Sequence, residues 1–216
     1  MNRIPSPLLV VTDRHQARRP PEEIVAEVLA AGARWIWFRD RDLEIAERRQ
    51  LAMRLSKLVQ DAGGCLSIGG DIELAAEAGT HAVHVRDIAA VAEARRQFGL
   101  AALIGLSAHS IADVEHAPAA GADYVTLSPI FHSASKPGYG PPLGLATIQR
   151  AAQIGIPVLA LGGITVSNVA ATMNAGAAGV AIMGSVMAAE TPAAVVDEIL
   201  QLTAGRVLAS ADRYSR

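Results

Sequence analysis

The sequence predicts a single (β/α)8 barrel, the TIM-barrel fold, on three observations. Eight short apolar segments recur along the 216 residues, and each is followed by a longer amphipathic stretch. Several of these segments are continuously apolar, as expected for parallel strands that are covered on both faces. Four helical stretches end in Ala-Gly-Ala or Ala-Gly-Thr just before a strand, where glycine is well suited to end a helix. An open doubly wound sheet is the alternative, but nothing in the sequence resembles its G-x-G-x-x-G turn.

Strands and helices are expected to alternate over the whole chain. The expected strands are Leu8–Thr12, Trp35–Arg39, Cys65–Ile68, Ala82–Val85, Leu103–Leu106, Tyr124–Ser128, Val158–Leu161 and Val180–Met183. The expected helices are Glu22–Ala31, Leu43–Ala62, Ile72–Ala78, Ile88–Phe98, Ile111–Ala119, Leu145–Gln153, Ser167–Asn174 and Pro192–Leu202. Ser167 is expected to cap its helix through its hydroxyl group. Residues 1–203 therefore form one barrel domain, and the polar residues 204–216 are expected to fray.

Composition and charge exclude several classes of protein. Hydrophobic residues make up 51% of the chain, which is enough to bury a full core. The net charge of −2 argues against a nucleic-acid partner. The single cysteine, Cys65, permits no internal disulfide and is expected to be buried. No apolar run reaches membrane-spanning length and the N-terminus lacks a signal-peptide core, so we expect a cytoplasmic protein without membrane contact.

Glycines follow the last two expected strands and predict a phosphate site. Gly162 and Gly163 come after the seventh strand, and Gly184 and Ser185 come after the eighth. Phosphate groups often bind at these two places in a barrel, because glycine lets backbone N–H groups approach the phosphate oxygens. The alternative is that these glycines only make tight turns. We expect the ligand to be a phosphorylated small molecule.

The longest expected loop, residues 129–142, follows the sixth strand on the same face of the barrel. It is rich in glycine and proline and carries Ser133, Ser135 and Lys136. Long loops in compact domains are usually functional, so we expect these three side chains to fold over a phosphate or diphosphate group. A surface loop with a solvated lysine is the alternative.

Motifs at most strand ends resemble the thiamine phosphate synthase/TenI family over nearly the whole chain. The resembling segments are Val11–Arg14, Phe38–Arg39, Gly105–Ser110, Gly121–Val125, Ser128–Phe131, Ser133–Lys136, Leu143–Leu145, Pro157–Ile164 and Gly179–Ala181. The family synthase joins hydroxymethylpyrimidine diphosphate to thiazole phosphate and releases diphosphate. What the resemblance implies is a dissociative displacement in which magnesium and cationic side chains hold the departing diphosphate.

The resemblance also implies roles for individual residues. Lys136, Ser133, Ser135 and Ser107 match the group that binds the diphosphate, and Arg39 matches the arginine that lies along it. The glycine turns after the seventh and eighth strands, including Ser185, match the site of the thiazole phosphate.

The segment after the second strand departs from the family pattern. Where the family has Gln-x-Arg-x-Lys, this chain has Trp37 in place of the glutamine and Arg41 in place of the lysine. Trp37 would fill the pyrimidine pocket if its side chain points into the barrel, and the identity of the aromatic group that this pocket takes is left open. Trp35 and Trp37 are expected in the core, and the possibility of a homo-oligomer is left open.

The expected magnesium ligands are also replaced. The family's Asn-Asp-Arg reads as residues 69–71, Gly-Gly-Asp, and its Gly-Gln-x-Asp is replaced by Arg86 and Asp87. Asp71 and Asp87 lie close to the lost carboxylates and are the candidate magnesium ligands. Arg86 is a candidate to take over part of the work of the metal ion.

Two alternatives to a synthase remain open. A TenI-type thiazole tautomerase needs no magnesium, but Pro129 stands where that enzyme has its proton-transferring histidine. His132 and His109 are the candidate bases in its place, whereas His84 is expected to be a hydrogen-bonded core histidine. A non-catalytic protein that binds a thiamine precursor is the other alternative.

Overall fold

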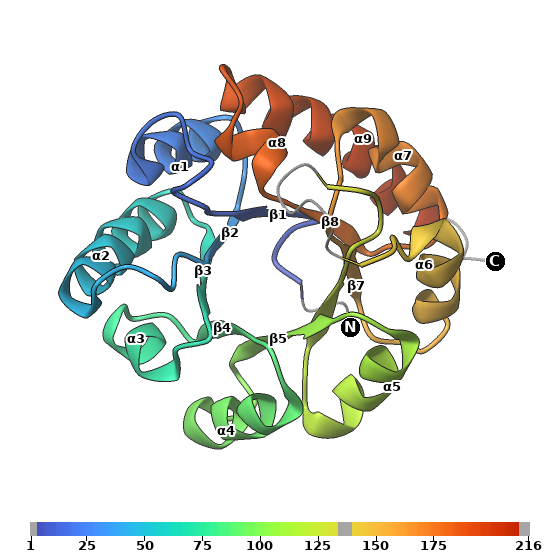
Figure 1. The fold of residues 1–216 in the computed structure, drawn as a ribbon, viewed down its shortest axis with the longest axis horizontal. Helices are drawn as coiled ribbons and strands as arrows, with labels where there is room; N and C mark the ends of the chain where they lie inside the picture. The colour runs from blue at the N-terminus through green and yellow to red at the C-terminus, as the bar shows by residue number, and fades with distance from the viewer. Residues whose placement is uncertain (1–3, 134–139, 212–216) are drawn as a thin grey trace.

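A computed structural model confirms the predicted barrel, and it describes residues 4–133 and 140–211, with side chains up to residue 204. Eight parallel strands close into one barrel in sequence order, so that the first strand pairs with both the second and the eighth. Looking down the barrel axis, the helices form an outer ring around the strands (Figure 1).

The strands lie where the sequence predicts them, to within two residues at each end. They are β1 (Leu8–Val11), β2 (Trp35–Phe38), β3 (Cys65–Gly69), β4 (Ala82–Val85), β5 (Leu103–Ala108), β6 (Tyr124–Leu127), β7 (Val158–Ala160) and β8 (Gly179–Ile182). The helices are α1 (Pro21–Ala30), α2 (Ile45–Asp61), α3 (Ile72–Glu77), α4 (Ile88–Phe98), α5 (Ile111–Ala120), α6 (Gly144–Ala152), α7 (Val166–Asn174), α8 (Gly184–Met187) and α9 (Pro192–Ala211).

Two helix ends differ from the prediction. Helix α7 is capped by Thr165, not by Ser167, because Thr165 and Asn168 form a reciprocal capping box in which each side chain bonds to the backbone of the other. Helix α9 continues to Ala211, beyond the predicted end at Leu202. The fraying predicted for residues 204–216 is thus wrong for residues 204–211, which are helical, and residues 212–216 lie outside the described residues.

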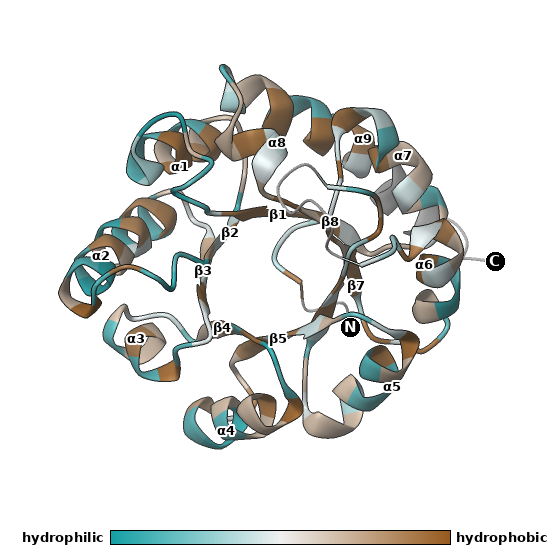
Figure 2. Cartoon of the chain, in the orientation of Figure 1, coloured by the Kyte–Doolittle hydropathy of each residue, from teal (hydrophilic) through white to brown (hydrophobic). Residues whose placement is uncertain are grey.

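The hydrophobic residues form two cores. The larger one lies between the outer face of the strands and the inner face of the helices. The smaller one fills the barrel itself and includes Leu9, Trp35, Trp37 and Tyr124. In Figure 2 several strands carry brown residues, and brown and teal residues alternate around most of the helices. Alternate residues of each strand thus serve the two cores.

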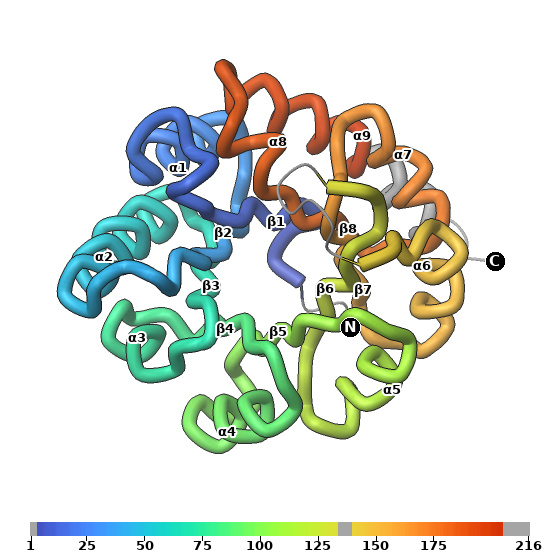
Figure 3. Tube along the Cα trace, viewed as in Figure 1, coloured from blue at the N-terminus to red at the C-terminus, as the bar shows by residue number. Residues whose placement is uncertain are grey.

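The described residues that precede β1, residues 4–7, lie across the centre of the ring of strands (Figure 3). Among them, Ile4 packs against the core inside the barrel. This segment therefore covers the N-terminal end of the barrel, which leaves the opposite end for a ligand.

Polar side chains inside the barrel form a connected group above this cover. Trp35 donates its indole N–H to Ser67 Oγ at 3.0 Å. His84 Nδ1 and Tyr124 OH are 3.0 Å apart, and both residues are fully buried. As predicted, His84 is a hydrogen-bonded core histidine. The two rings meet over Gly105, where a Cβ atom would lie 2.2 Å from Tyr124 Cζ and 2.4 Å from His84 Nδ1.

We predict that Gly105→Ala lowers the free energy of unfolding by about 3 kcal/mol, because the added methyl group overlaps two fixed rings. Urea denaturation measures this change. The matched control is Gly155→Ala, where an added methyl group has no neighbouring atom within 4 Å and only a positive φ of 92° opposes the change. That control should cost about 1 kcal/mol. Equal costs for both variants would contradict the overlap.

Candidate active site

A cavity of about 980 Å³ opens at the C-terminal ends of the strands. Segments that follow β1, β2, β4, β5, β6, β7 and β8 all contribute to its wall. These segments are far apart in the sequence, and the closed barrel brings them together at one end. Active sites of this fold are found at this end, so the cavity is the candidate active site.

Trp37 forms part of the floor of the cavity. Its side chain points into the barrel, is only 4% exposed and packs on His84 with ring centroids 3.9 Å apart. A Cβ atom on Gly69 would lie 2.9 Å from Trp37 Nε1. The indole thus occupies the space that a side chain at position 69 would need. Its N–H is buried without a partner in the described part of the chain.

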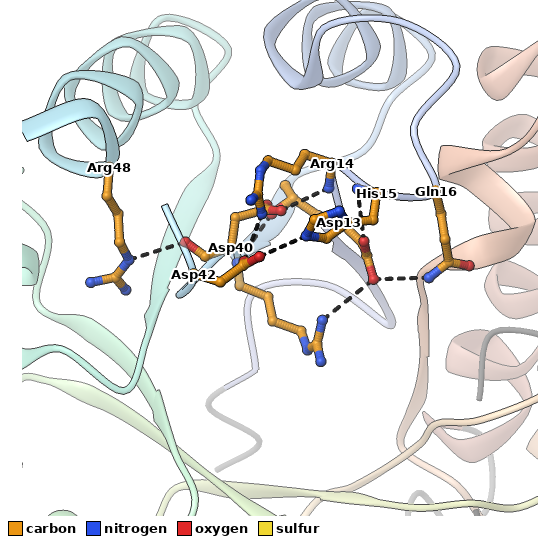
Figure 4. A network of polar contacts seen from close by, with 9 residues as sticks. Asp13, Arg14, His15, Gln16, Asp40, Asp42 and Arg48 are labelled. Atoms are coloured by element: carbon orange, nitrogen blue, oxygen red, sulfur yellow. Dashed lines mark hydrogen bonds and ion pairs between the residues drawn. The ribbon is translucent and has the colours of Figure 1, made fainter. Parts of the chain in front are cut away.

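The loops after β1 and β2 are held together by Asp40, which is 4% exposed. Its carboxylate accepts hydrogen bonds from Thr12 Oγ1 at 2.5 Å and from Arg14 N at 2.7 Å. The carbonyl oxygen of Asp40 accepts a further bond from Arg48 Nε at 3.2 Å (Figure 4). These contacts fix the position of the β2 loop relative to the β1 loop.

Arg39 lies on this loop and lines the cavity, as its predicted role requires. Its guanidinium group is 3.4 Å from Asp13 Oδ2, and its side chain keeps one third of its surface exposed. Asp13 also accepts bonds from Gln16 Nε2 at 2.8 Å and from the backbone of His15 at 3.0 Å (Figure 4). Asp13 therefore orients Arg39 and leaves part of the guanidinium group open to the cavity.

At the rim of the cavity, Asp42 contacts both Arg14 and His15 (Figure 4). Each of the two side chains has a nitrogen atom 2.6 Å from an Asp42 oxygen. The hydrogen bond from Arg14, followed by that from His15, lowers the pKa of Asp42 well below its usual range. Asp42 is thus a charged carboxylate in the working pH range, and it is engaged by two donors.

Asp71, a predicted magnesium ligand, is used in two structural contacts. Its Oδ1 accepts a hydrogen bond from Leu74 N at 2.9 Å and caps α3. Its Oδ2 forms a short contact with Arg48 Nη1, and Arg48 also donates to the carbonyl oxygen of Gly69 at 3.0 Å. Both carboxylate oxygens are thus engaged, and the negative charge is matched by a guanidinium group on a residue that is 9% exposed.

Asp87, the other predicted ligand, accepts a hydrogen bond from Ala90 N at 2.9 Å and caps α4. Neither Asp71 nor Asp87 is among the described residues that line the cavity. In the described ranges, no group of three or more His, Cys, Asp or Glu side chains is placed to hold a metal ion. The described residues therefore do not form a magnesium cage made of protein ligands alone.

Ser107, predicted to bind diphosphate, lines the cavity from the end of β5. Its hydroxyl group is 3.1 Å from His84 Nε2, and Thr126 Oγ1 is at the same distance from that nitrogen. Full burial lowers the pKa of His84 to about 3, so the ring is neutral at pH 7. The inner group of polar side chains thus reaches the cavity through Ser107 and sets the orientation of its hydroxyl.

His109 and His132, the predicted bases, both line the cavity. His109 Nδ1 is 2.9 Å from the carbonyl oxygen of Ser128. A carbonyl oxygen only accepts, so Nδ1 is the donor in this contact. Ser128 was not singled out by the sequence analysis, although its place directly after β6 is the signal that would have found it.

A second pocket of about 520 Å³ adjoins the first. It is lined by the predicted phosphate residues Gly162, Gly163, Gly184 and Ser185, and it shares His132 and Ser133 among other residues with the larger cavity. Ser185 donates its hydroxyl to the carbonyl oxygen of Ile164 at 2.7 Å. This bond ties the turn after β8 to the turn after β7.

The other two predicted residues, Ser135 and Lys136, lie outside the described residues. Their nearest described neighbours on either side, Ser133 and Gly140, both line the larger cavity.

Comparison with known proteins agrees with this geometry. The family model described as thiamine monophosphate synthase matches residues 8–186. The thiamine-phosphate synthase of Halorhodospira halophila is 36% identical over 203 residues, which cover 93% of this chain and 97% of that protein. The chain belongs to this family. The thiamine-phosphate synthase of Methanoculleus marisnigri is 39% identical over 184 residues, 83% of this chain and 87% of that protein. The family resemblance seen in the sequence is thereby confirmed.

The solved thiamine phosphate pyrophosphorylase of Pyrococcus furiosus has the same fold. It superimposes with a TM-score of 0.81 at 24% identity and covers 92% of this chain and 95% of its own. Like the family assignment, the (β/α)8 prediction is confirmed. Among the described residues, no helix combines the length and apolar character needed to cross a membrane.

We predict that His84 makes the fold sensitive to acid. Its pKa is lowered in the folded state, so below its ordinary value of about 6.5 the unfolded chain binds a proton that the folded chain does not. Stability is therefore lost as pH falls from about 6.5 toward 3. Between pH 7 and pH 5, the parent should lose about 2 kcal/mol more than His84→Gln, as measured by urea unfolding. Parallel pH profiles for the two proteins would contradict this origin.

Proposed function

We propose that this chain is a thiamine-phosphate synthase that couples hydroxymethylpyrimidine diphosphate to thiazole phosphate and releases diphosphate. The family and its curated relatives support the reaction class. The observation that carries the proposal is the pair of adjoining pockets, because the reaction needs room for two phosphorylated substrates side by side.

The two pockets differ in the chemistry of their walls. Glycine turns at Gly162–Gly163 and at Gly184 line the smaller pocket, where backbone N–H groups suit a phosphate monoester. Arg39 lines the larger cavity, where its fixed charge suits the greater negative charge of a diphosphate. We assign the thiazole phosphate to the smaller pocket and the pyrimidine diphosphate to the larger one.

The larger cavity supports a displacement in which charge develops on the departing diphosphate. Arg39 and Ser107 supply a cation and a hydroxyl group from the strand ends, and Ser133 supplies another hydroxyl from the β6 loop. Lys136 follows three residues later and is assigned to the same diphosphate. No step is assigned to magnesium, because the described residues offer it no cluster of three or more protein ligands.

The indole of Trp37 in the cavity floor suits a ligand that stacks on it, whereas the glutamine of the family pattern would offer hydrogen bonds. Trp37 presents its indole to the cavity where the family pattern has glutamine, and His84 supports the ring from below. An aromatic pyrimidine gains stacking energy on such a surface. The tautomerase alternative is not favoured, since the matched relatives cited above are named synthases.

The proposal is tested by incubating the protein with both substrates and magnesium and measuring thiamine phosphate. We expect product. We also expect Lys136→Ala to lower kcat/KM by about 100-fold, because the variant loses a cationic side chain that would stabilise the departing diphosphate. The matched control is Lys57→Ala, which removes the chain's other lysine from an exposed pair with Asp61 on α2.

The control should retain the parent rate. Absence of product, with the Halorhodospira enzyme active in parallel, would refute the synthase. Proton exchange on thiazole phosphate alone would then indicate the tautomerase, and tight binding without turnover would indicate a non-catalytic binder.

A further inference from the structure

Two arginines in the wall of the larger cavity depart from the family pattern described above, since Arg41 replaces a lysine and Arg86 lies where a carboxylate segment is lost. Arg41 lies on the loop after β2, and Arg86 follows β4. Arg41 packs against Gly70, where a Cβ atom would lie 3.0 Å from Arg41 Cζ. Gly70 also has a positive φ of 66°, a conformation that disfavours any larger residue. The guanidinium group thus fills the volume that a side chain after β3 would occupy.

Arg41 has a donor that is not used within the described residues. Its Nε is buried and has no hydrogen-bond partner in the described part of the chain. A guanidinium group carries five N–H donors in a fixed fork that matches pairs of phosphate oxygens. A buried donor without a partner is costly, and an anion that enters the cavity can supply acceptors to this group.

The carboxylates of the cavity wall are engaged by protein donors. Asp13 accepts from Gln16, and Asp40 accepts from Thr12. Asp42 is held between two side chains at the rim. A magnesium ion at any of these carboxylates would therefore have to compete with protein donors for the carboxylate oxygens.

The carboxylate nearest to Gly70 in the sequence is neutralised in place. Asp71 is bound by Arg48, and it points its other oxygen at the N-terminus of α3. Next to the end of β3, the cavity wall is therefore formed by Arg41 from the neighbouring β2 loop. The carboxylate of Asp71 is paired with Arg48 and does not line the cavity.

We infer that Arg41 and Arg86 bind the diphosphate of the substrate directly, in place of a divalent metal ion. The inference rests on the proposed function for the identity of the ligand. Together with Arg39, the two side chains place permanent positive charge at the ends of β2 and β4. Guanidinium groups do not dissociate from the protein, so chelation of metals should leave this anion site intact.

The test uses inorganic diphosphate as the probe and isothermal titration calorimetry with excess EDTA. The parent should bind diphosphate under these conditions. Arg41→Ala and Arg86→Ala should each weaken the affinity by about 10-fold or more, because a charge-assisted contact is lost. The matched control is Arg96→Ala on α4, whose side chain is 75% exposed and contacts Glu93. It should bind as the parent does.

Thermal unfolding is measured for each variant, and two variants keep the test independent of any folding defect. Arg86 is exposed, so its replacement leaves the core untouched. Arg41→Lys retains the charge but loses the fork, so its affinity should fall between those of the parent and Arg41→Ala. Binding by the parent only with added magnesium would overturn the inference, as would unchanged affinity in both alanine variants.

Failure of this inference is separable from failure of the proposed function. Diphosphate binding that requires magnesium, with thiamine phosphate formed in the same buffer, would leave a conventional synthase. Diphosphate binding in EDTA without any thiamine phosphate formation would leave the arginine site and refute the synthase.

Discussion

The buried carboxylate of Asp40 is the contact on which the arrangement of the site depends. A buried charge is costly unless it is hydrogen-bonded, and Thr12 Oγ1 and Arg14 N satisfy this one at 2.5 and 2.7 Å. Both donors come from the β1 segment, so the β2 loop has one favourable position against it. Arg39 and Arg41 flank Asp40 in the sequence and are thereby placed at the cavity wall.

The departures from the family pattern are coupled in space. Trp37 lies over Gly69, and Arg41 lies over Gly70, so each enlarged residue on the β2 side faces a glycine on the β3 side. Close packing leaves no room for a large side chain in both positions. The departures at these four positions therefore belong to one wall, in which an indole and a guanidinium group on the β2 side pack over two glycines on the β3 side.

The barrel was predictable because strands with both faces covered leave a continuous apolar signature, as in Trp35–Phe38. The glycine turns were predicted from their places after the last two strands and Ser107 from the family resemblance, and closure of the barrel brings these strand ends together. The contacts of Asp71 were not predictable, because a carboxylate after a strand is equally suited to a metal ion, a helix cap or an ion pair. Its choice depends on Arg48, which lies 23 residues away. No local pattern shows that pairing.

Among the described residues, the charges of the cavity wall are balanced in number. The arginines and aspartates that line it are Arg39, Arg41, Arg86, Asp13, Asp40 and Asp42. Without aspartates, neighbouring guanidinium groups would repel one another before a ligand arrives. With them, the wall is close to neutral, and buried Asp40 serves mainly to fix the backbone. A site organised in this way keeps its cationic donors at every physiological pH, because guanidinium groups do not titrate there. Its affinity for an anion then depends on where the donors lie, which the packing of β2 against β3 determines.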